Sequence, residues 1–306
     1  MLPPGLHPQV AAVLAQEGSS SLGAAADLAG LRASYAATAK RLGGVPEPVA
    51  GVRDVLVDGT IPALAYRPLV PAAGAPGCLL WLHGGGWIIG DLEGVDHVCR
   101  ALANASGHVV VSVDYRLAPE HPFPAGLDDA RAALRWAGGP GAAELGHEPG
   151  RVALGGDSAG ANLVTVAARD GGARVQLLVY PVTDGALDTA SHLAGTQGPL
   201  LTRAEMESCW SAYVAPDLRL HPDASPLRAG PELLAAGPPA VVVVCGFDVL
   251  RDEGLAYAER LTRAGVDTEL VDFPDMVHGF LRWGGAVDRA GELIALLGSR
   301  VRAALA

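Results

Sequence analysis

The strongest constraint on the fold of this chain is a serine flanked by glycines directly after an apolar run. Residues 151–155 read RVALG, and residues 156–160 read GDSAG. This pattern predicts a strand that turns sharply into a helix with Ser158 at the apex, because so tight a turn leaves no room for side chains beside the serine. Such a turn lifts the hydroxyl clear of the sheet. It also directs the first amides of the helix towards the same point, where they can stabilise a developing negative charge.

Short apolar runs alternate with helical segments from residue 55 onward. Several runs are almost continuously apolar, as in strands that are covered on both faces. The alternation predicts the α/β class, with a mostly parallel central sheet and helices on both faces. The expected strands are residues 61–66, 78–82, 109–113, 152–155, 175–180, 240–245 and 268–273. The expected helices are about residues 95–105, 126–137, 159–169, 253–264 and 287–305.

Two segments interrupt this alternation. Residues 1–45 contain two amphipathic helical patterns, near residues 7–17 and 25–42, before any expected strand. Residues 184–225 contain a polar stretch and then a helix whose first residues, from Thr202 to Glu205, form a capping box. A long insertion after a central strand commonly forms a lid. We therefore expect a helical cap that is built from both segments.

Composition excludes several classes of protein. Charged residues make up 18% of the chain and the net charge is −11, which argues against a nucleic-acid surface. The longest stretch without Asp, Glu, Lys or Arg, residues 68–90, contains three prolines and several glycines, so no stable membrane insertion is expected. The first residues show no secretory signal pattern, which predicts a cytoplasmic location. The four cysteines have no CxxC spacing and are expected to be reduced and buried.

Ser158 has suitable partners later in the chain. A serine hydroxyl becomes a good nucleophile only when a base removes its proton, and a base histidine needs a carboxylate to orient it. Asp248 follows the expected strand 240–245, and His278 follows the expected strand 268–273. Because parallel strands end at one edge of a sheet, all three side chains should converge there.

A run of glycines supplies a further part of the predicted site. Residues 83–87 read HGGGW and follow the expected strand 78–82. Three consecutive glycines leave backbone amides bare enough to approach a substrate oxygen closely. Two of these amides, together with that of Ala159, could form an oxyanion hole. The remaining histidines show no ligand spacing, so neither a metal nor another cofactor is expected.

In these motifs the chain resembles the hormone-sensitive-lipase-like esterases, the bacterial family IV branch of the α/β-hydrolases. The resemblance covers residues 76–280 and rests on HGGGW at 83–87, DYRLAPEHPFPA at 114–125, GDSAG at 156–160, DVLRDEG at 248–254 and VHGF at 277–280. It implies the α/β-hydrolase fold and assigns these site residues: Ser158 as nucleophile, His278 as base, Asp248 as orienting acid, and Gly85, Gly86 and Ala159 as amide donors.

The expected function is that of a serine carboxylesterase. It would hydrolyse short- to medium-chain carboxylic esters through an acyl-enzyme. An amidase, lactonase or formamidase could use the same triad, because specificity lies in the cap and the pocket walls. A non-catalytic ligand receptor on the same fold is a further alternative. Such receptors usually lack a triad member, whereas this chain has all three candidates. The expected organisation is a cap segment at residues 1–45 and a catalytic domain at 46–306, with a cap insertion at about 184–225. A homodimer could form if residues 268–273 are a sheet edge.

Two acidic residues near the predicted site have competing interpretations. Asp252 could replace Asp248 as the acid, but it fits better as the N-cap of the following helix. Asp275 lies on the same loop as His278 and is expected to be solvated.

Several other residues near the motifs have structural interpretations. His83 is expected to be a structural hydrogen-bonding residue, and Tyr115 is expected to brace the loop beside the site. Trp87, Phe280 and Trp283 fit either the acyl pocket or the core.

Overall fold

The central sheet contains both parallel and antiparallel strands. The computed structural model describes residues 3–17, 27–194 and 201–306, and within them one eight-stranded sheet has the order β1-β2-β4-β3-β5-β6-β7-β8. The strands are β1 (Gly51–Val57), β2 (Ile61–Arg67), β3 (Cys78–Leu82), β4 (Val109–Val113), β5 (Val152–Asp157), β6 (Gln176–Val179), β7 (Ala240–Phe247) and β8 (Thr268–Val277). From β4 to β8 all neighbours are parallel, whereas β2 is antiparallel to both β1 and β4. The prediction of a mostly parallel sheet is confirmed.

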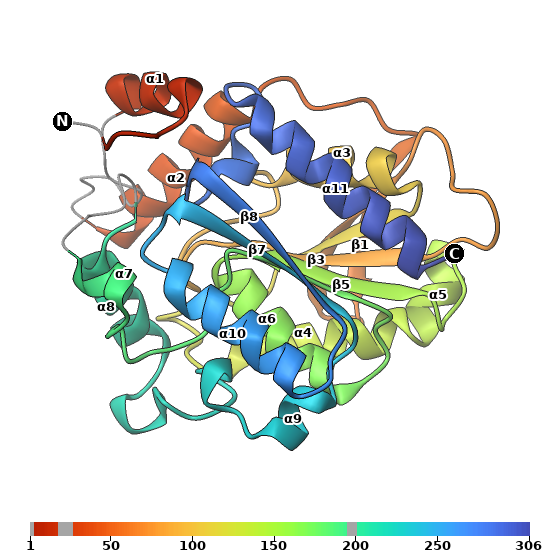
Figure 1. The fold of residues 1–306 in the computed structure, drawn as a ribbon. Helices are drawn as coiled ribbons and strands as arrows, with labels where there is room; N and C mark the ends of the chain where they lie inside the picture. The colour runs from red at the N-terminus through yellow and green to blue at the C-terminus, as the bar shows by residue number, and fades with distance from the viewer. Residues whose placement is uncertain (1–2, 18–26, 195–200) are drawn as a thin grey trace.

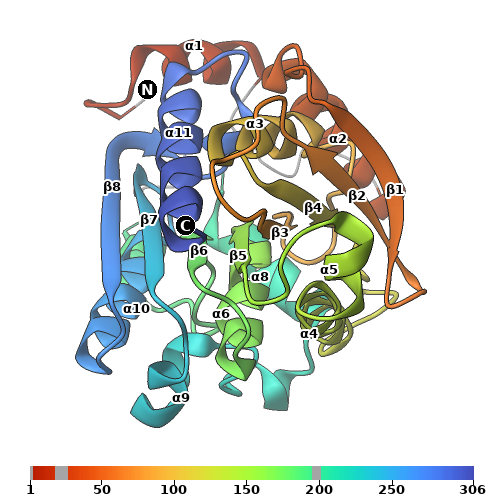
Figure 2. The same cartoon turned by 90° about the vertical axis from the view of Figure 1, so that its right-hand side faces the viewer.

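Helices cover both faces of this sheet, as Figure 2 shows. The helices α3 (Asp96–Ser106) and α11 (Asp288–Ala304) pack against each other on one face. The helices α4 (Ala125–Ala137), α6 (Ala159–Ala167) and α10 (Arg251–Arg263) cover the other. Shorter elements are α5 (Pro140–Leu145), α9 (Pro231–Ala235) and the 3₁₀ turns η1 (Ala168–Asp170), η2 (Pro216–Leu218), η3 (Pro226–Arg228) and η4 (Phe280–Arg282). Among helices in the described ranges, none combines the length and apolarity needed to cross a membrane.

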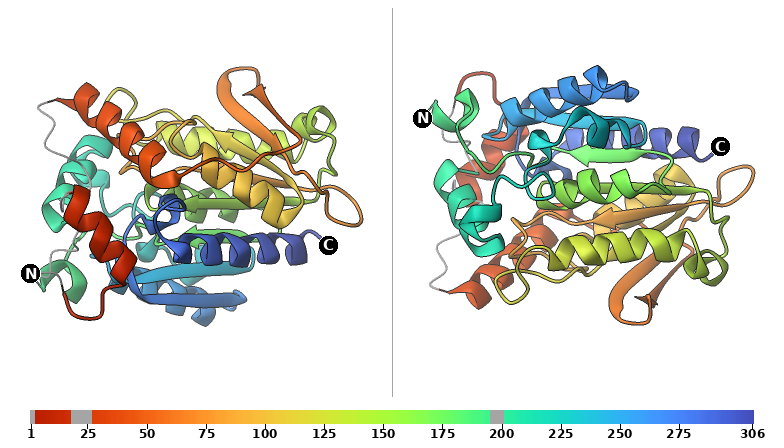
Figure 3. Two further views of the ribbon diagram at one scale, coloured as in Figure 1. Left: turned by 90° about the horizontal axis from the view of Figure 1, so that it is seen from above. Right: turned by 90° about the horizontal axis from the view of Figure 1, so that it is seen from below.

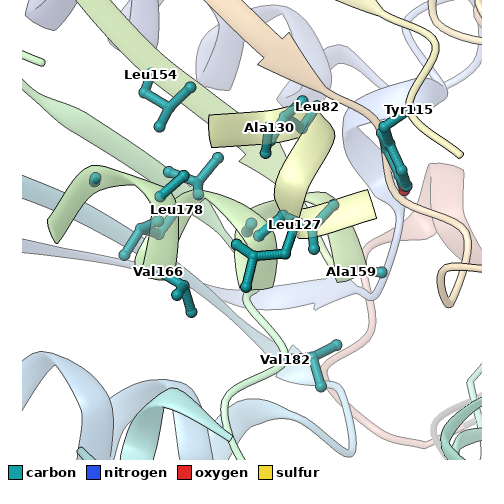
Figure 4. Packing of buried hydrophobic residues seen from close by; sticks show 14 of the residues in the cluster. Leu82, Tyr115, Leu127, Ala130, Leu154, Ala159, Val166, Leu178 and Val182 are labelled. Carbon is teal, nitrogen blue, oxygen red and sulfur yellow. The ribbon is translucent and has the colours of Figure 1, made fainter. Parts of the chain in front are cut away.

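The core forms because the central strands are apolar on both sides. Every residue of β3, β4 and β5 is buried. Figure 4 shows side chains of β3, β5 and β6 packing against α4 and α6. The strands contribute Leu82, Leu154 and Leu178, and the helices contribute Leu127 and Val166. Buried residues on α4 recur at helical spacing, which places them on the face towards the sheet, whereas every residue of α6 is buried. This packing holds the ends of β3 and β5 in fixed relative positions.

The helices of the two segments that are expected to form the cap gather at one end of the sheet. They are α1 (Pro8–Glu17), α2 (Leu28–Gly43), α7 (Ala190–Leu193) and α8 (Arg203–Tyr213), and the views of Figures 1 and 3 place them far from the C-terminus. The predicted capping box opens α8: the Glu205 amide donates to Thr202 Oγ1 at 3.2 Å, and the Thr202 amide donates to Glu205 Oε2 at 2.7 Å. Residues 195–200 of the expected insertion lie outside the described residues. The division into a segment 1–45 and a domain 46–306 stays a prediction.

The sequence analysis missed one strand. β1 has buried side chains at Val55 and Val57 alone, and most of its other residues are exposed. It is the antiparallel edge of the sheet, so one side has no neighbouring strand, and no continuous apolar run marks it. The other edge is β8, as the dimer hypothesis required, and it runs on to Val277, four residues beyond its expected end.

Candidate active site

Ser158 stands at a strained turn between β5 and α6. Its φ of 55° is rare for a residue other than glycine. The Ser158 amide donates to the Val179 carbonyl at 2.9 Å, which ties the turn to the neighbouring strand β6. A Cβ at Gly156 would lie 2.6 Å from the Leu82 carbonyl oxygen, and a Cβ at Gly160 would lie 2.0 Å from the same atom. The predicted strand–turn–helix is therefore present, and the close approach of β3 is the reason that both glycines are needed.

The structure brings the three predicted triad residues into one hydrogen-bonded chain. His278 Nε2 lies 2.9 Å from Ser158 Oγ, and His278 Nδ1 lies 2.8 Å from Asp248 Oδ2. The other carboxylate oxygen, Oδ1, accepts a hydrogen bond from the Leu250 amide at 2.9 Å. Because Asp248 accepts the Nδ1 proton, Nε2 is left to accept from the serine hydroxyl. The three side chains follow β5, β7 and β8, so they meet at the carboxyl edge of the sheet.

The predicted amide donors lie beside Ser158. Gly85 has a φ of 134° and Gly86 a φ of 58°, both in the region that favours glycine. A Cβ at Gly85 would lie 2.1 Å from the Ile89 carbonyl oxygen, so a side chain is excluded there. Gly85, Gly86, Ser158 and His278 line one pocket. Ala159, the third predicted donor, begins α6 directly after the serine.

Asp157 connects the glycine loop to the strand that carries Ser158. Its side chain is fully buried, and Oδ1 accepts a hydrogen bond from the Gly84 amide at 2.9 Å. Burial raises the pKa of this carboxyl to about 6, since the charged form is poorly solvated. The other oxygen, Oδ2, lies 3.6 Å from Arg282 Nε. Asp157 therefore holds the loop of expected amide donors against β5.

The pocket also has walls from the cap. Tyr35 comes from α2, and Met206 and Cys209 come from α8. Leu201 and Arg282 complete this side. Sequence reasoning did not single out any of these five residues, because they belong to no motif and meet only in the fold.

The three aromatic residues with an open assignment belong to the core. Trp87 stacks on Tyr213 with ring centroids 4.1 Å apart and an interplanar angle of 2°. Phe280 and Trp283 are buried in the apolar cluster around α3 and α11. None of the three lines the pocket that contains Ser158, as far as the described residues define it.

The structural interpretations of His83 and Tyr115 are confirmed. The side chain of His83 is fully buried, with Nδ1 3.0 Å from the Gly84 carbonyl oxygen. Burial lowers the pKa of His83, so the ring is held neutral. The Tyr115 hydroxyl donates to the His83 carbonyl at 2.7 Å, and the two rings stack with centroids 4.6 Å apart. Tyr115 thereby braces the start of the glycine loop.

Two predictions about acidic residues are wrong. Asp252 is not the N-cap of α10, because the helix already begins at Arg251. Its Oδ2 instead accepts from the Ser191 amide at 2.7 Å and so ties the cap insertion to α10. Asp275 is not solvated: its side chain is 22% exposed and Oδ2 lies 3.2 Å from Arg289 Nη2.

Among the described residues there is neither a cluster of metal ligands nor a cysteine near the surface. Within the described ranges, no three His, Cys, Asp or Glu side chains are grouped so that they could hold a metal ion. All four cysteines are free and buried, as expected. Burial raises the pKa of the Cys209 thiol to about 12, so this pocket residue is not a thiolate at neutral pH.

Known proteins share this fold and much of this sequence. A family model described as the alpha/beta hydrolase fold matches residues 79–282. The carboxylesterase NlhH of Mycobacterium tuberculosis is 43% identical over 263 residues, which are 81% of this chain and 80% of that protein. The ethyl acetate hydrolase of Pseudomonas putida is 36% identical over 247 residues, 78% of this chain and 77% of that protein.

A solved structure agrees with these sequence matches. The hyperthermophilic esterase from the archaeon Pyrobaculum calidifontis is similar in structure with a TM-score of 0.89 and 34% identity, covering 98% of this chain and 99% of that one. The family match extends over more than half of the chain. The chain therefore belongs to the alpha/beta hydrolase fold family, in its hormone-sensitive-lipase-like branch.

Proposed function

We propose that this protein is a serine carboxylesterase that hydrolyses short- to medium-chain carboxylic esters. The observation that carries the proposal is the hydrogen-bonded chain from Ser158 Oγ through His278 to Asp248, with distances of 2.9 and 2.8 Å. The names of the relatives, a carboxylesterase and an ethyl acetate hydrolase, support the same reaction.

The first half of the reaction forms an acyl-enzyme. Ser158 Oγ attacks the ester carbonyl while His278 Nε2 takes the hydroxyl proton, and Asp248 stabilises the resulting imidazolium. The carbonyl oxygen becomes an oxyanion that accepts from the amides of Gly85, Gly86 and Ala159. When the bond to the alkoxy oxygen breaks, His278 returns the proton to the leaving alcohol. The acyl group is now bonded to Ser158.

The second half repeats these steps with water. His278 removes a proton from a water molecule, whose oxygen attacks the acyl carbonyl. The second tetrahedral intermediate uses the same amides. Its collapse breaks the bond to Ser158 Oγ, which takes back the proton from His278, and the carboxylic acid leaves. Every proton is thus carried by the imidazole of His278, and the proposed reaction needs no cofactor.

The mechanism is tested by removing the hydroxyl of Ser158. Ser158→Ala should lower kcat for p-nitrophenyl butanoate by at least about 10⁴-fold, because the nucleophile is lost. Its thermal unfolding midpoint should not fall. Ser208→Ala is the matched control, since that hydroxyl is exposed on α8 and donates only to the Ala204 carbonyl, at 3.0 Å. An organophosphate should label the wild type and the control but not Ser158→Ala. Near-wild-type turnover by Ser158→Ala would refute the mechanism.

Two further predictions from the sequence extend this proposal. We propose a homodimer in which the exposed edge β8 pairs with a second copy, and a cytoplasmic location. The position of β8 at the sheet edge supports the first. Sedimentation of the purified protein as a monomer at micromolar concentration would exclude the dimer.

A further inference from the structure

Arg282 is a buried cation in the wall of the pocket that contains Ser158. Only 10% of its side chain is exposed, yet the guanidinium donates no hydrogen bond to any described residue. The guanidinium faces Asp157, with Oδ2 3.6 Å from Nε, and the ring of Tyr35, with the centroid 4.4 Å from Cζ. A guanidinium has five N–H donors, and buried donors are normally satisfied. The pocket therefore holds a cation with donors to spare.

Tyr35 lines the same pocket and carries a second donor without a partner in the described part of the chain. Its hydroxyl is buried and has no hydrogen-bond partner among the described residues, although Tyr35 lines the pocket with Ser158 and Arg282. A buried hydroxyl without a partner is unfavourable, and a ligand that supplies an acceptor relieves that cost. Tyr35 belongs to α2 and Arg282 to η4, so two separate elements bring these donors together.

The charges around Arg282 favour an uncharged acceptor. Asp157 already faces the guanidinium and supplies one negative charge. A carboxylate on the substrate would add a second negative charge close to Asp157 and to the oxyanion that forms at the glycine loop. Repulsion between like charges is strong in a pocket from which water is excluded. A carbonyl oxygen accepts hydrogen bonds from the same donors without adding charge.

We propose that Arg282 and Tyr35 form a specificity site for a second, uncharged carbonyl oxygen in the ester substrate. Keto esters and diesters are then better substrates than alkyl esters of the same length. The guanidinium of Arg282 and the hydroxyl of Tyr35 both donate to that oxygen while Ser158 attacks the scissile carbonyl. The inference rests on the proposed esterase reaction and adds the class of substrate.

The experiment compares esters that differ by one group. On the acyl side, p-nitrophenyl 4-oxopentanoate is compared with p-nitrophenyl pentanoate and with mono-p-nitrophenyl succinate, which has a carboxylate in place of the acetyl end. On the alcohol side, the butanoate of 4-hydroxybutan-2-one is compared with butyl butanoate. For at least one of these pairs, kcat/KM for the ketone should exceed that for the alkyl ester by about 10- to 100-fold, the usual effect of a hydrogen bond to a charged group. The succinate should be poorer than the ketone.

Two variants assign the effect to the two donors. In Arg282→Met the ratio of kcat/KM between ketone and alkyl ester should fall to about 1, and in Tyr35→Phe it should fall several-fold. The ratio is taken within each variant, so a general loss of activity does not affect it. Tyr35→Phe removes a single atom and carries the test if Arg282→Met does not fold. Arg263→Met, at an arginine whose side chain is 73% exposed, is the control and should keep the wild-type ratio.

Other outcomes separate this inference from the proposed function. A wild-type ratio near 1 for both pairs, or a succinate that is preferred to the ketone, overturns the specificity site while the esterase reaction stands. A ratio that persists in both Arg282→Met and Tyr35→Phe also overturns it. If the wild type hydrolyses none of these esters, the proposed function itself fails.

Discussion

The serine turn and the cap helix α2 border the same pocket, but different interactions hold them in place. The turn depends on backbone packing, because β3 lies so close to it that no side chain fits at Gly160. Helix α2 buries Leu42 in the core and is also attached by a polar side chain: Arg32 donates to Glu120 at 2.7 and 2.8 Å, and its Nε donates to the Ile88 carbonyl at 2.9 Å. The side chain of Glu120 is 49% exposed, so water and salt weaken this ion pair.

The second cap segment, residues 184–225, is also held by polar side chains, but these bonds lie within the segment. Glu207 on α8 forms a two-pronged ion pair with Arg219, at 2.6 and 2.7 Å, and Arg203 donates to the Leu187 carbonyl at 2.9 Å. The reacting groups are thus fixed by the sheet, while the cap helices are held by buried residues such as Leu42 and Met206 together with partly exposed ion pairs. Substitution can change the cap without disturbing the triad, which is consistent with one fold serving many ester substrates.

The largest effect is expected from Gly160→Ala. The added Cβ would lie 2.0 Å from the Leu82 carbonyl oxygen, and backbone cannot move away cheaply. We expect a loss of more than about 4 kcal/mol in the free energy of unfolding, seen as insoluble protein or as a lost near-ultraviolet circular dichroism spectrum. Gly291→Ala on α11 is the control, because nothing lies within 4 Å of its Cβ. A folded Gly160→Ala enzyme with wild-type stability would show that the turn is not fixed by backbone packing.

An intermediate effect is expected from Asp157→Asn, which removes the contribution of this carboxyl to the pH dependence of stability. The folded-state pKa of Asp157, about 6, is above the ordinary value of 3.8, so folding favours the protonated form. This carboxyl therefore stabilises the fold most below pH 4, and that contribution is lost as the pH rises through 6. The loss is on the order of 3 kcal/mol, since one pKa unit corresponds to about 1.4 kcal/mol.

Urea unfolding at several pH values measures this contribution. Between pH 4 and pH 7 the free energy of unfolding of the wild type should fall relative to that of Asp157→Asn, whose amide does not titrate. Parallel curves over this range would mean that burial of Asp157 does not control its protonation.

The smallest effect is expected from the α2 attachment. Arg32→Ala should lower the free energy of unfolding by about 1–2 kcal/mol, because it removes a charge-assisted pair and a hydrogen bond to backbone. Since α2 carries Tyr35, kcat/KM should fall as well. Arg263→Ala, which breaks an exposed pair with Glu259, should cost no more than about 0.5 kcal/mol.

Salt dependence distinguishes this attachment from the packed turn. The loss caused by Glu120→Gln should shrink in 1 M NaCl, where the Debye length is about 3 Å. A loss that stays the same in high salt would place the attachment in packing rather than in charge.

The parts of the site that sequence predicted are those marked by local chemistry. Gly85 and Gly86 adopt positive φ and the glycines around Ser158 make room for β3, so both places are marked in the sequence by a dense glycine pattern. Asp248 and His278 could be placed because each follows an apolar strand, and parallel strands end at one edge.

The parts that sequence missed depend on contacts between distant segments. Tyr35 and Arg282 are far apart in the chain and meet only when α2 packs beside η4. Asp252 is a residue type that often caps a helix, but its side chain accepts a hydrogen bond from the amide of Ser191 in the cap insertion. The edge strand β1 lacks the continuous apolar run of a strand with neighbours on both sides. Such features follow from tertiary packing, which local patterns do not record.

The position of the C-terminus has a practical consequence. Helix α11 ends at the opposite end of the sheet from the cap, as Figure 1 shows. An affinity tag or a covalent link to a bead placed after Ala306 would therefore direct the pocket away from the support. Immobilised in this way, the protein would present its opening to the flowing solution, and large esters could reach it without meeting the surface.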